Sequence, residues 1–182
     1  MRKCKRDASH ADGQTDMRDK KEKLIVIYVG DAHNVVNRIV FNHCRGNVEA
    51  SALRKHIAEA MGYKLKRTKR PSGSTRVRID MPDPQIGERK ISAYIQTGKW
   101  KYVICESYNE AHDFQWYVIE MLNPLLNKER KQWDIRRSDR YSFLLQELSK
   151  CPPLQCTQLI YQAAGPGVYA FYHIIPPHKF KT

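Results

Sequence analysis

The sequence has no hydrophobic run long enough to cross a membrane. Its longest apolar run extends from Leu24 to Val29, whereas a membrane-spanning helix needs roughly 20 apolar residues. No apolar stretch follows the basic start of the chain, so no secretory signal is expected. We therefore expect an intracellular protein, cytoplasmic or nucleoid-associated, that has no membrane partner.

Cysteine is present in a small and odd number. The chain has five cysteines and no CxxC pair. Closely spaced pairs are typical of zinc sites, and an even set of cysteines is typical of a disulfide framework. We therefore expect neither of these features and predict reduced thiols.

Acidic residues are too few to balance the basic ones. The 182 residues include 32 Lys and Arg against 19 Asp and Glu, which gives a net charge of +13. This excess predicts a polyanionic partner, with nucleic acid first and an anionic membrane surface second. No amphipathic basic helix supports the membrane alternative.

The excess charge is concentrated in two interior segments. Residues 63–78 carry seven basic and no acidic side chains, and residues 128–140 carry six basic and three acidic ones. Residues 79–127, between them, have a net charge of −3. Basic segments on both sides of an acidic one are what the capture and cleavage of a phosphodiester require.

The hydrophobic pattern predicts an α+β fold in one domain. Residues 1–22 mix both charges with almost no apolar side chains, which is typical of a mobile tail, and residues 23–182 are expected to form the domain. We expect strands at 24–29, 76–80, 100–105 and 168–175, helices at 35–44, 51–61, 107–122 and 138–150, a basic loop at 63–75 and turns at 81–90.

Three segments carry side chains suited to chemistry. Tyr28-Val29-Gly30 ends the first predicted strand, and Arg38 follows on the next helix, where it borders the apolar face and needs an anionic partner. Glu120 lies beside the apolar face of a later helix, where a carboxylate is costly unless it is paired or metal-bound. Asn127 follows seven residues later, and Gly165 to Phe171 read GPGVYAF.

These segments together resemble the motifs of the GIY-YIG nuclease family. YVGDAHNVVNR (28–38) is similar to the second motif with its helix arginine, and WYVIEMLNPLLNKERKQW (116–133) is similar to the metal-binding helix. The resemblance implies a small three-stranded antiparallel sheet flanked by helices. The basic segment would then be an added hairpin or loop.

The order of the motifs departs from the family pattern. In the family a GIY strand precedes the YIG strand by about ten residues, whereas only a charged tail precedes Leu24 here. GPGVYAF resembles the missing first motif, so we expect a circularly permuted domain whose first strand is supplied by residues 165–175. Permutation is tolerated because chain termini often lie close together. The alternative is a domain without its first motif.

A second departure concerns the position four residues after Arg38, where the family has His or Tyr. Asn42 occupies this position and His43 follows it. One residue corresponds to about 100° of an α-helix. His43 can therefore take the family role only if the helix is distorted.

The resemblance implies a metal-dependent endonuclease that hydrolyses DNA, with RNA as the less favoured substrate. Glu120 would hold one Mg²⁺ or Mn²⁺, since Mg²⁺ is often bound by a single carboxylate with waters and phosphate. Arg38 would hold the phosphate, and Tyr28 or Tyr169 would accept the proton of the attacking water if its pKa were lowered. Asn127 would orient the water or a tyrosine hydroxyl.

The basic segments are expected to contact the nucleic-acid backbone. The residues concerned are Lys64, Lys66, Arg67, Lys69, Arg70, Arg76, Arg78, Arg130 and Lys131. The alternative function is a nucleic-acid-binding protein on a weakened nuclease fold. Cutting both strands would need a homodimer or two successive nicks by a monomer.

Overall fold

The computed structural model describes residues 23–159 and 165–180, so the predicted tail at 1–22 lies outside the described residues. The strands are β1 (Ile25–Ala32), β2 (Leu65–Lys69), β3 (Thr75–Ile79), β4 (Lys99–Ile104) and β5 (Gly167–His173). The α-helices are α1 (Val35–Asn37), α2 (Ala52–Ala60), α3 (Pro84–Thr97), α4 (Tyr108–Leu122) and α5 (Ser138–Lys150). A π-helix, η1 (Arg38–Cys44), continues α1, and short 3₁₀ turns are η2 (Ile135–Arg137), η3 (Cys156–Gln158) and η4 (Pro177–Lys179).

A three-stranded antiparallel sheet forms the centre of the fold, which confirms the predicted fold class. The strand order is β1-β5-β4, so the last strand of the chain is the central one. β5 is buried along nearly its whole length. Because β5 pairs antiparallel with β1 and with β4, the sheet depends on the C-terminal segment.

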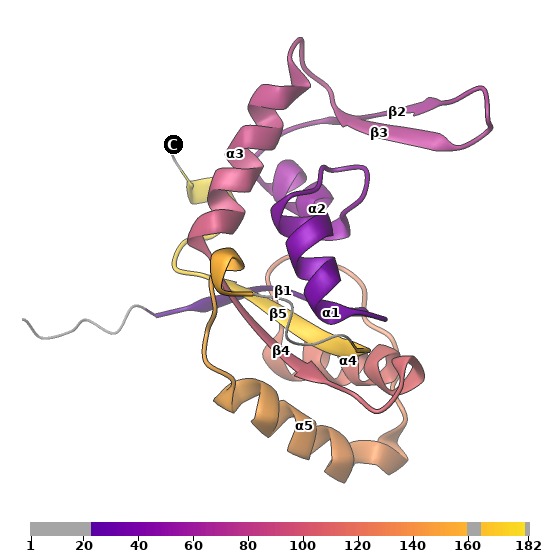
Figure 1. Ribbon diagram of the computed structural model, residues 1–182, viewed down its shortest axis with the longest axis vertical. Coiled ribbons are helices and arrows are strands. Elements are labelled where there is room, and N and C mark those ends of the chain that lie inside the picture. The colour runs from indigo at the N-terminus through magenta and orange to yellow at the C-terminus, as the bar shows by residue number, and fades with distance from the viewer. Residues whose placement is uncertain (1–22, 160–164, 181–182) are drawn as a thin grey trace, which may run out of the picture.

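Helices cover both faces of this sheet (Figure 1). The first apolar core contains Ile39, Ile57 and Ile91 and lies under η1, α2 and α3. The second contains Phe114 and Leu144 and lies between the sheet and α4 with α5. The helices predicted at 51–61, 107–122 and 138–150 agree with α2, α4 and α5 within two residues.

The basic segment forms an antiparallel hairpin that extends from the body of the molecule (Figure 1). Residues 63–75 were expected to be a loop, yet residues 65–69 form β2, which pairs with β3. At the base of the hairpin Val77 and Ile79 are buried and join the first core. The alternation of lysines and arginines with few apolar residues concealed the strand at 65–69.

The expected turns at 81–90 were wrong for most of their length, because α3 begins at Pro84. Asp83 caps this helix, its carboxylate accepting the Gln85 N–H at 2.9 Å. Pro84 occupies the first helical turn, where its fixed φ and missing N–H are tolerated. Gly87 lies against Ile79, and a Cβ there would overlap the Ile79 side chain.

The structure also corrects the prediction of reduced thiols. Cys44, at the end of η1, forms a disulfide with Cys156 in η3, and their Cα atoms are 6.4 Å apart. The two residues are separated by 112 positions, so no local spacing reveals the pair. Cys105 and Cys151 are free. Among the described residues no helix is long and apolar enough to cross a bilayer.

Candidate active site

Tyr28 on β1 and Tyr169 on β5 lie next to each other. The antiparallel register places Gly30 opposite Tyr169, and the centroids of the two tyrosine rings are 6.5 Å apart. A Cβ on residue 30 would overlap the Tyr169 hydroxyl. Glycine at this position therefore lets the Tyr169 ring lie across β1.

The helix distortion that His43 requires is present. Residues Arg38–Cys44 form a π-helix, in which each N–H bonds to the carbonyl five residues earlier; the N–H of Arg45, which donates to the Val40 carbonyl at 3.1 Å, shows this pattern. Residues five apart thus share one face, so His43 lies where the fourth residue after Arg38 would lie in an α-helix. Its Nε2 is 2.7 Å from the Tyr169 hydroxyl.

His43 is fixed from both sides of its ring. Its Nδ1 lies 2.6 Å from the Ser51 hydroxyl, and Ser51 also accepts the backbone N–H of Arg54 as the cap of α2. His43 is completely buried. Burial, followed by the charges of Arg38 and Arg54, lowers its pKa well below the ordinary histidine value, so the ring is neutral at neutral pH.

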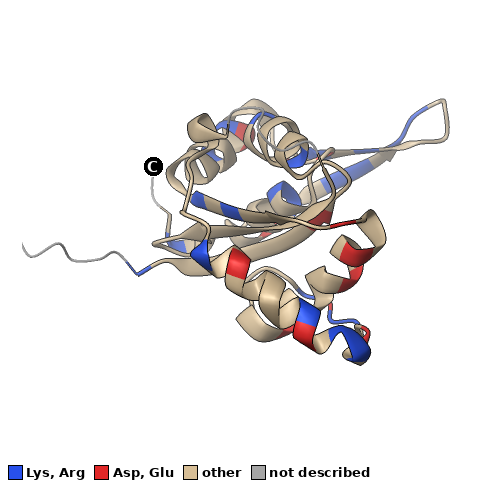
Figure 2. Ribbon diagram, turned by 60° about the horizontal axis from the view of Figure 1, so that its bottom comes forward, with Lys and Arg blue, Asp and Glu red and all other residues tan. Residues whose placement is uncertain are grey.

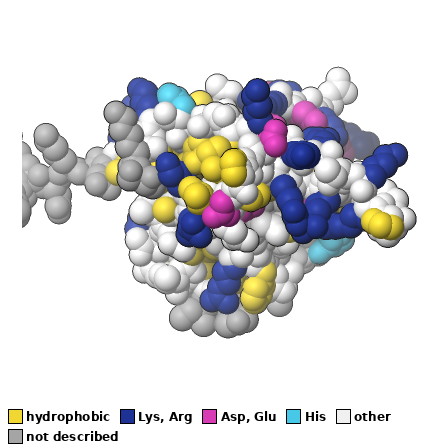
Figure 3. Space-filling model, turned by 90° about the horizontal axis from the view of Figure 1, so that it is seen from above, with side chains coloured by type: hydrophobic (Ala, Val, Ile, Leu, Met, Phe, Trp, Pro, Cys, Tyr) yellow, Lys and Arg dark blue, Asp and Glu magenta, His cyan; other side chains and the backbone are white. Residues whose placement is uncertain are grey.

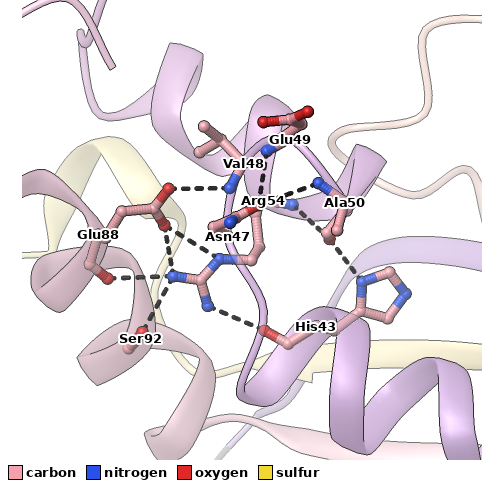
Figure 4. Close-up of polar contacts among 9 residues, drawn as sticks. His43, Asn47, Val48, Glu49, Ala50, Arg54, Glu88 and Ser92 are labelled. Carbon is pink, nitrogen blue, oxygen red and sulfur yellow. Dashed lines mark hydrogen bonds and ion pairs between the residues drawn. The ribbon is translucent and has the colours of Figure 1, made fainter. Parts of the chain in front are cut away.

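A buried arginine holds the segment around His43 in place (Figure 4). Arg54 donates to the His43 carbonyl at 2.9 Å and forms an ion pair with Glu88 of α3 at 2.7 Å. The second Glu88 oxygen accepts the Val48 N–H at 2.9 Å, and Ser92 accepts from Arg54 at 3.0 Å. This network links η1, α2 and α3, and the sequence motifs gave no sign of it.

Arg38 lies beside the two tyrosines at the partly exposed start of η1. Its Nη1 donates to the Ala50 carbonyl at 3.2 Å. Its positive charge opposes the rise in the pKa of both Tyr28 and Tyr169. Since the described residues give Arg38 no carboxylate partner in an ion pair, the guanidinium retains capacity for an anion.

The pKa values of both tyrosine hydroxyls are raised, whereas the predicted role as a base needs a lowered pKa. Burial raises the pKa of Tyr28 to about 12 despite the nearby Arg38. Burial also raises the pKa of Tyr169 well above its ordinary value, and this residue is only 1% exposed. Both hydroxyls are therefore protonated at neutral pH and can donate hydrogen bonds.

A cleft of about 270 Å³ opens beside Tyr28. His56 of α2 lies on one wall, and its ring centroid is 6.1 Å from that of Tyr28. Gln115 and Trp116 of α4 form another wall, and the remaining lining residues are Asn127, Lys128 and Glu129. The sequence motifs identified Tyr28 and Asn127, whereas His56 and Gln115 carry no signal that separates them from ordinary helix residues.

Asn127 attaches the segment after α4 to β1. Its Oδ1 accepts the Val29 N–H at 2.8 Å, and its Nδ2 donates to the Val29 carbonyl at 2.9 Å. These paired bonds use both ends of the amide on the backbone next to Tyr28. Asn127 therefore positions the cleft, and the structure does not show it oriented toward a tyrosine hydroxyl.

The structure does not bring Glu120 into the cleft. Its carboxylate is on the exposed side of α4 and accepts the indole N–H of Trp133 at 2.7 Å. Five residues separate it from Gln115, which is about 140° around an α-helix. Of the two α4 residues that line the cleft, Gln115 and Trp116, neither is a carboxylate. The predicted cost of Glu120 beside the apolar face is relieved by its exposure and by its bond to Trp133.

The described residues do not form a metal-binding set. Among residues 23–159 and 165–180, no three His, Cys, Asp or Glu side chains converge as metal ligands. Glu120 lies outside the cleft, and Gln115 offers only a neutral amide oxygen. Glu129 is the carboxylate among the residues that line the cleft, and we assign no ligand to a divalent cation.

Lys and Arg occupy many positions along the hairpin (Figure 2), and basic side chains gather on this side of the surface (Figure 3). Cross-strand pairing places Lys66 opposite Arg78, and both are exposed. Like charges directly opposite each other are destabilising in a sheet. A polyanion bound along the hairpin would offset this repulsion. Arg130 bonds within its own segment, to Asn127 and Asn123.

A family model described as "GIY-YIG catalytic domain" matches residues 2–142. The matched region includes β1, η1 and α4 but ends before β5, so it carries no information about the C-terminal strand. The chain has no significant match among curated proteins or solved structures.

Proposed function

Because the chain belongs to the GIY-YIG catalytic-domain family, whose members are nucleases acting on nucleic acid, we propose that it is an endonuclease that hydrolyses DNA phosphodiester bonds. The observation that supports this most strongly is the arrangement of Tyr28, Arg38 and His43 with Tyr169. Three elements, β1, η1 and β5, bring these side chains together on the face of the sheet that packs against η1. The partly exposed Arg38 bonds to the Ala50 carbonyl but has no carboxylate partner among the described residues.

In the proposed site Arg38 binds the scissile phosphate. A guanidinium matches the geometry of phosphate oxygens and offsets the charge that develops during attack. Tyr28, half-buried at the cleft, donates a hydrogen bond to a phosphate oxygen because its hydroxyl stays protonated. Tyr169 and His43 act as positioning residues, since both are buried and bonded to each other.

The requirement for Mg²⁺ or Mn²⁺ is part of the proposal and comes from the family alone. When bound, such a cation stabilises the negative charge on the phosphate. No step is assigned to the cation, because Glu120, the predicted ligand, is not among the residues that line the cleft. The cation dependence is therefore an experimental question of its own.

We further propose that residues 23–182 form a single permuted domain, with residues 165–175 in the place of the family's first strand. The antiparallel pairing of β5 with β1 and the position of Tyr169 support this proposal. The nucleic-acid partner would lie along the hairpin residues Lys64, Lys66, Arg67, Lys69, Arg76 and Arg78, and beyond the cleft at Lys131. Arg70 already pairs with Glu49 at 2.7 Å.

The direct test is the nicking of supercoiled plasmid DNA by the wild-type protein with Mg²⁺, with Mn²⁺ or with EDTA. We expect the wild-type protein to nick the plasmid. Arg38→Ala should lower the nicking rate by about a hundredfold, the scale typical for the loss of one preorganised charge-stabilising group. Lys179→Ala, on η4 and outside the site, is the matched control. Wild-type protein that binds DNA without nicking it under any condition would contradict the proposal.

A second candidate function is that of a DNA-binding protein with weakened catalysis. Gln115 at the cleft and the outward position of Glu120 favour it specifically. The same plasmid experiment separates the two candidates, because a binding protein shifts the mobility of DNA and leaves it intact.

A further inference from the structure

A second cavity, of about 440 Å³, lies at the foot of the hairpin. It has no lining residue in common with the cleft of the proposed active site. Three segments form its walls: the loop after η1 with Arg45 and Asn47, the strand β3 with Arg76 and Arg78, and the start of α3 with Gln85. Its volume is within the range of about 300–1,000 Å³ that is typical of ligand sites.

The arginines of this cavity are available to a ligand. In the described part of the chain, no ion pair joins Arg45, Arg76 or Arg78 to a carboxylate. The guanidinium of Arg45 lies over the Phe41 ring, 5.8 Å from its centroid. Since a guanidinium packed by its flat face keeps the N–H donors along its edge free, this contact orients Arg45 without using its hydrogen bonds.

The carboxylates of the cavity, in contrast, are already neutralised by other arginines. Glu49 pairs with Arg70 of the hairpin at 2.7 Å. Glu88 pairs with Arg54 at 2.7 Å, and its second oxygen accepts the Val48 N–H at 2.9 Å (Figure 4). The positive charge of the three lining arginines therefore remains uncompensated, and the cavity favours an anion.

The chemistry of the walls fits a sugar phosphate. The fork of N–H donors on a guanidinium matches the oxygens of a phosphate group. The buried side chains of Val77 and Ile79 line the same cavity, and Pro84 adds further apolar surface beside them. An apolar wall next to cationic groups suits a ligand that joins a less polar ring to a charged phosphate.

We infer that this cavity binds a sugar-phosphate unit of the DNA strand, separate from the phosphate that is cut. The inference rests on the proposed nuclease function, which supplies the DNA. One loop connects the two sites, because Arg38 donates to the Ala50 carbonyl at 3.2 Å and Arg45 lies at the start of the same loop. Phosphate contacts of this kind fix the register of a protein on DNA.

The test is the salt dependence of binding to a fluorescent DNA duplex. Arg45→Gln should lower the slope of log K against log salt by about 0.9, because one phosphate contact is lost. Arg45→Lys should weaken binding by about tenfold although it keeps the charge, because an ammonium group lacks the guanidinium fork. Arg89→Gln, at an exposed position of α3 outside the cavity, is the matched control and should keep the wild-type slope.

A further variant fills the cavity without changing its charge. Gln85→Trp should weaken DNA binding by about tenfold and lower the salt slope, because the indole keeps the phosphate away from the arginines. Gln96→Trp, at an exposed position further along α3, should bind as wild type does. The melting temperature of each variant shows that it is folded.

A sugar phosphate can come from a DNA strand or from a free nucleotide, and calorimetry with thymidine 5′-monophosphate distinguishes the two sources. A free nucleotide is the ligand if thymidine 5′-monophosphate binds wild type but not Arg45→Gln, while every variant binds DNA as wild type does. That result would overturn the assignment to the DNA strand.

The inference also fails if Arg45→Gln and Gln85→Trp both bind DNA with the wild-type affinity and slope. Wild-type binding by Arg45→Lys is equally contrary to it, because the arginines would then act only as surface charge. In these cases nicking by the wild type leaves the proposed function standing. Wild-type protein that neither binds nor nicks DNA contradicts the proposed function itself, and the inference fails with it.

Discussion

Single residues determine what this site can do, and Gln115 is the most informative of them. It faces the cleft from α4, where a carboxylate would attract a divalent cation, while Glu120 lies outside and bonds to Trp133. The sequence predicted Glu120 of this helix as the metal ligand. The pattern could not show that Gln115 rather than Glu120 lines the cleft, because both lie beside apolar neighbours.

Gln115→Glu should strengthen the response of the protein to divalent cations. A carboxylate beside Tyr28 adds a negative charge of the kind that Mg²⁺ binds, usually with waters and phosphate completing the shell. We expect the Mg²⁺ concentration for half-maximal nicking to fall about tenfold, which corresponds to about 1.4 kcal/mol. The matched control is Glu120→Gln, which should leave that concentration unchanged.

If Gln115→Glu responds to Mg²⁺ as wild type does while Glu120→Gln loses the response, the positions of these two side chains relative to the substrate are not those described. Mg²⁺ titrations of plasmid nicking and of the melting temperature provide two independent readouts.

At the scale of elements, the π-helix and the hairpin show where sequence reasoning ends. The motif spacing left Asn42 and His43 as candidates for the family's His or Tyr position. The wider turn of the π-helix η1 is what brings His43 to the Tyr169 hydroxyl. Such a distortion depends on tertiary contacts, including the bond of Arg54 to the His43 carbonyl. The antiparallel pairing of β5 with β1 was expected from the resemblance of residues 165–171 to a motif, whereas the central position of β5 was not. The helix α3 was missed because Pro and Gly were read as turns.

Lys66→Gln combined with Arg78→Gln should weaken DNA binding without destabilising the fold. These like charges face each other across the hairpin, so their removal relieves repulsion. Each lost phosphate contact should reduce the slope of log K against log salt by about 0.9. Binding titrations at several salt concentrations measure this slope, with Lys179→Gln as the control; an unchanged slope would exclude the hairpin from the DNA interface.

For the whole molecule, the disulfide joins η1 to the segment that precedes the central strand. Reduction of Cys44–Cys156, whose partners are 112 residues apart, should lower the free energy of unfolding by about 2–4 kcal/mol. Urea unfolding with and without dithiothreitol measures the loss, and Cys44→Ser should show the same loss without responding to the reductant. Equal stability of oxidised and reduced wild type would contradict the bond's contribution.

The central claim is that the C-terminal strand completes a nuclease site with residues from the first third of the chain. Single-turnover plasmid nicking by Tyr169→Phe tests it most directly, with Tyr172→Phe on the same strand as the control and DNA binding measured for both. We predict that Tyr169→Phe binds DNA normally but nicks it at least about tenfold more slowly, because the bond to His43 at 2.7 Å is lost. Nicking by Tyr169→Phe at the wild-type rate would contradict the claim.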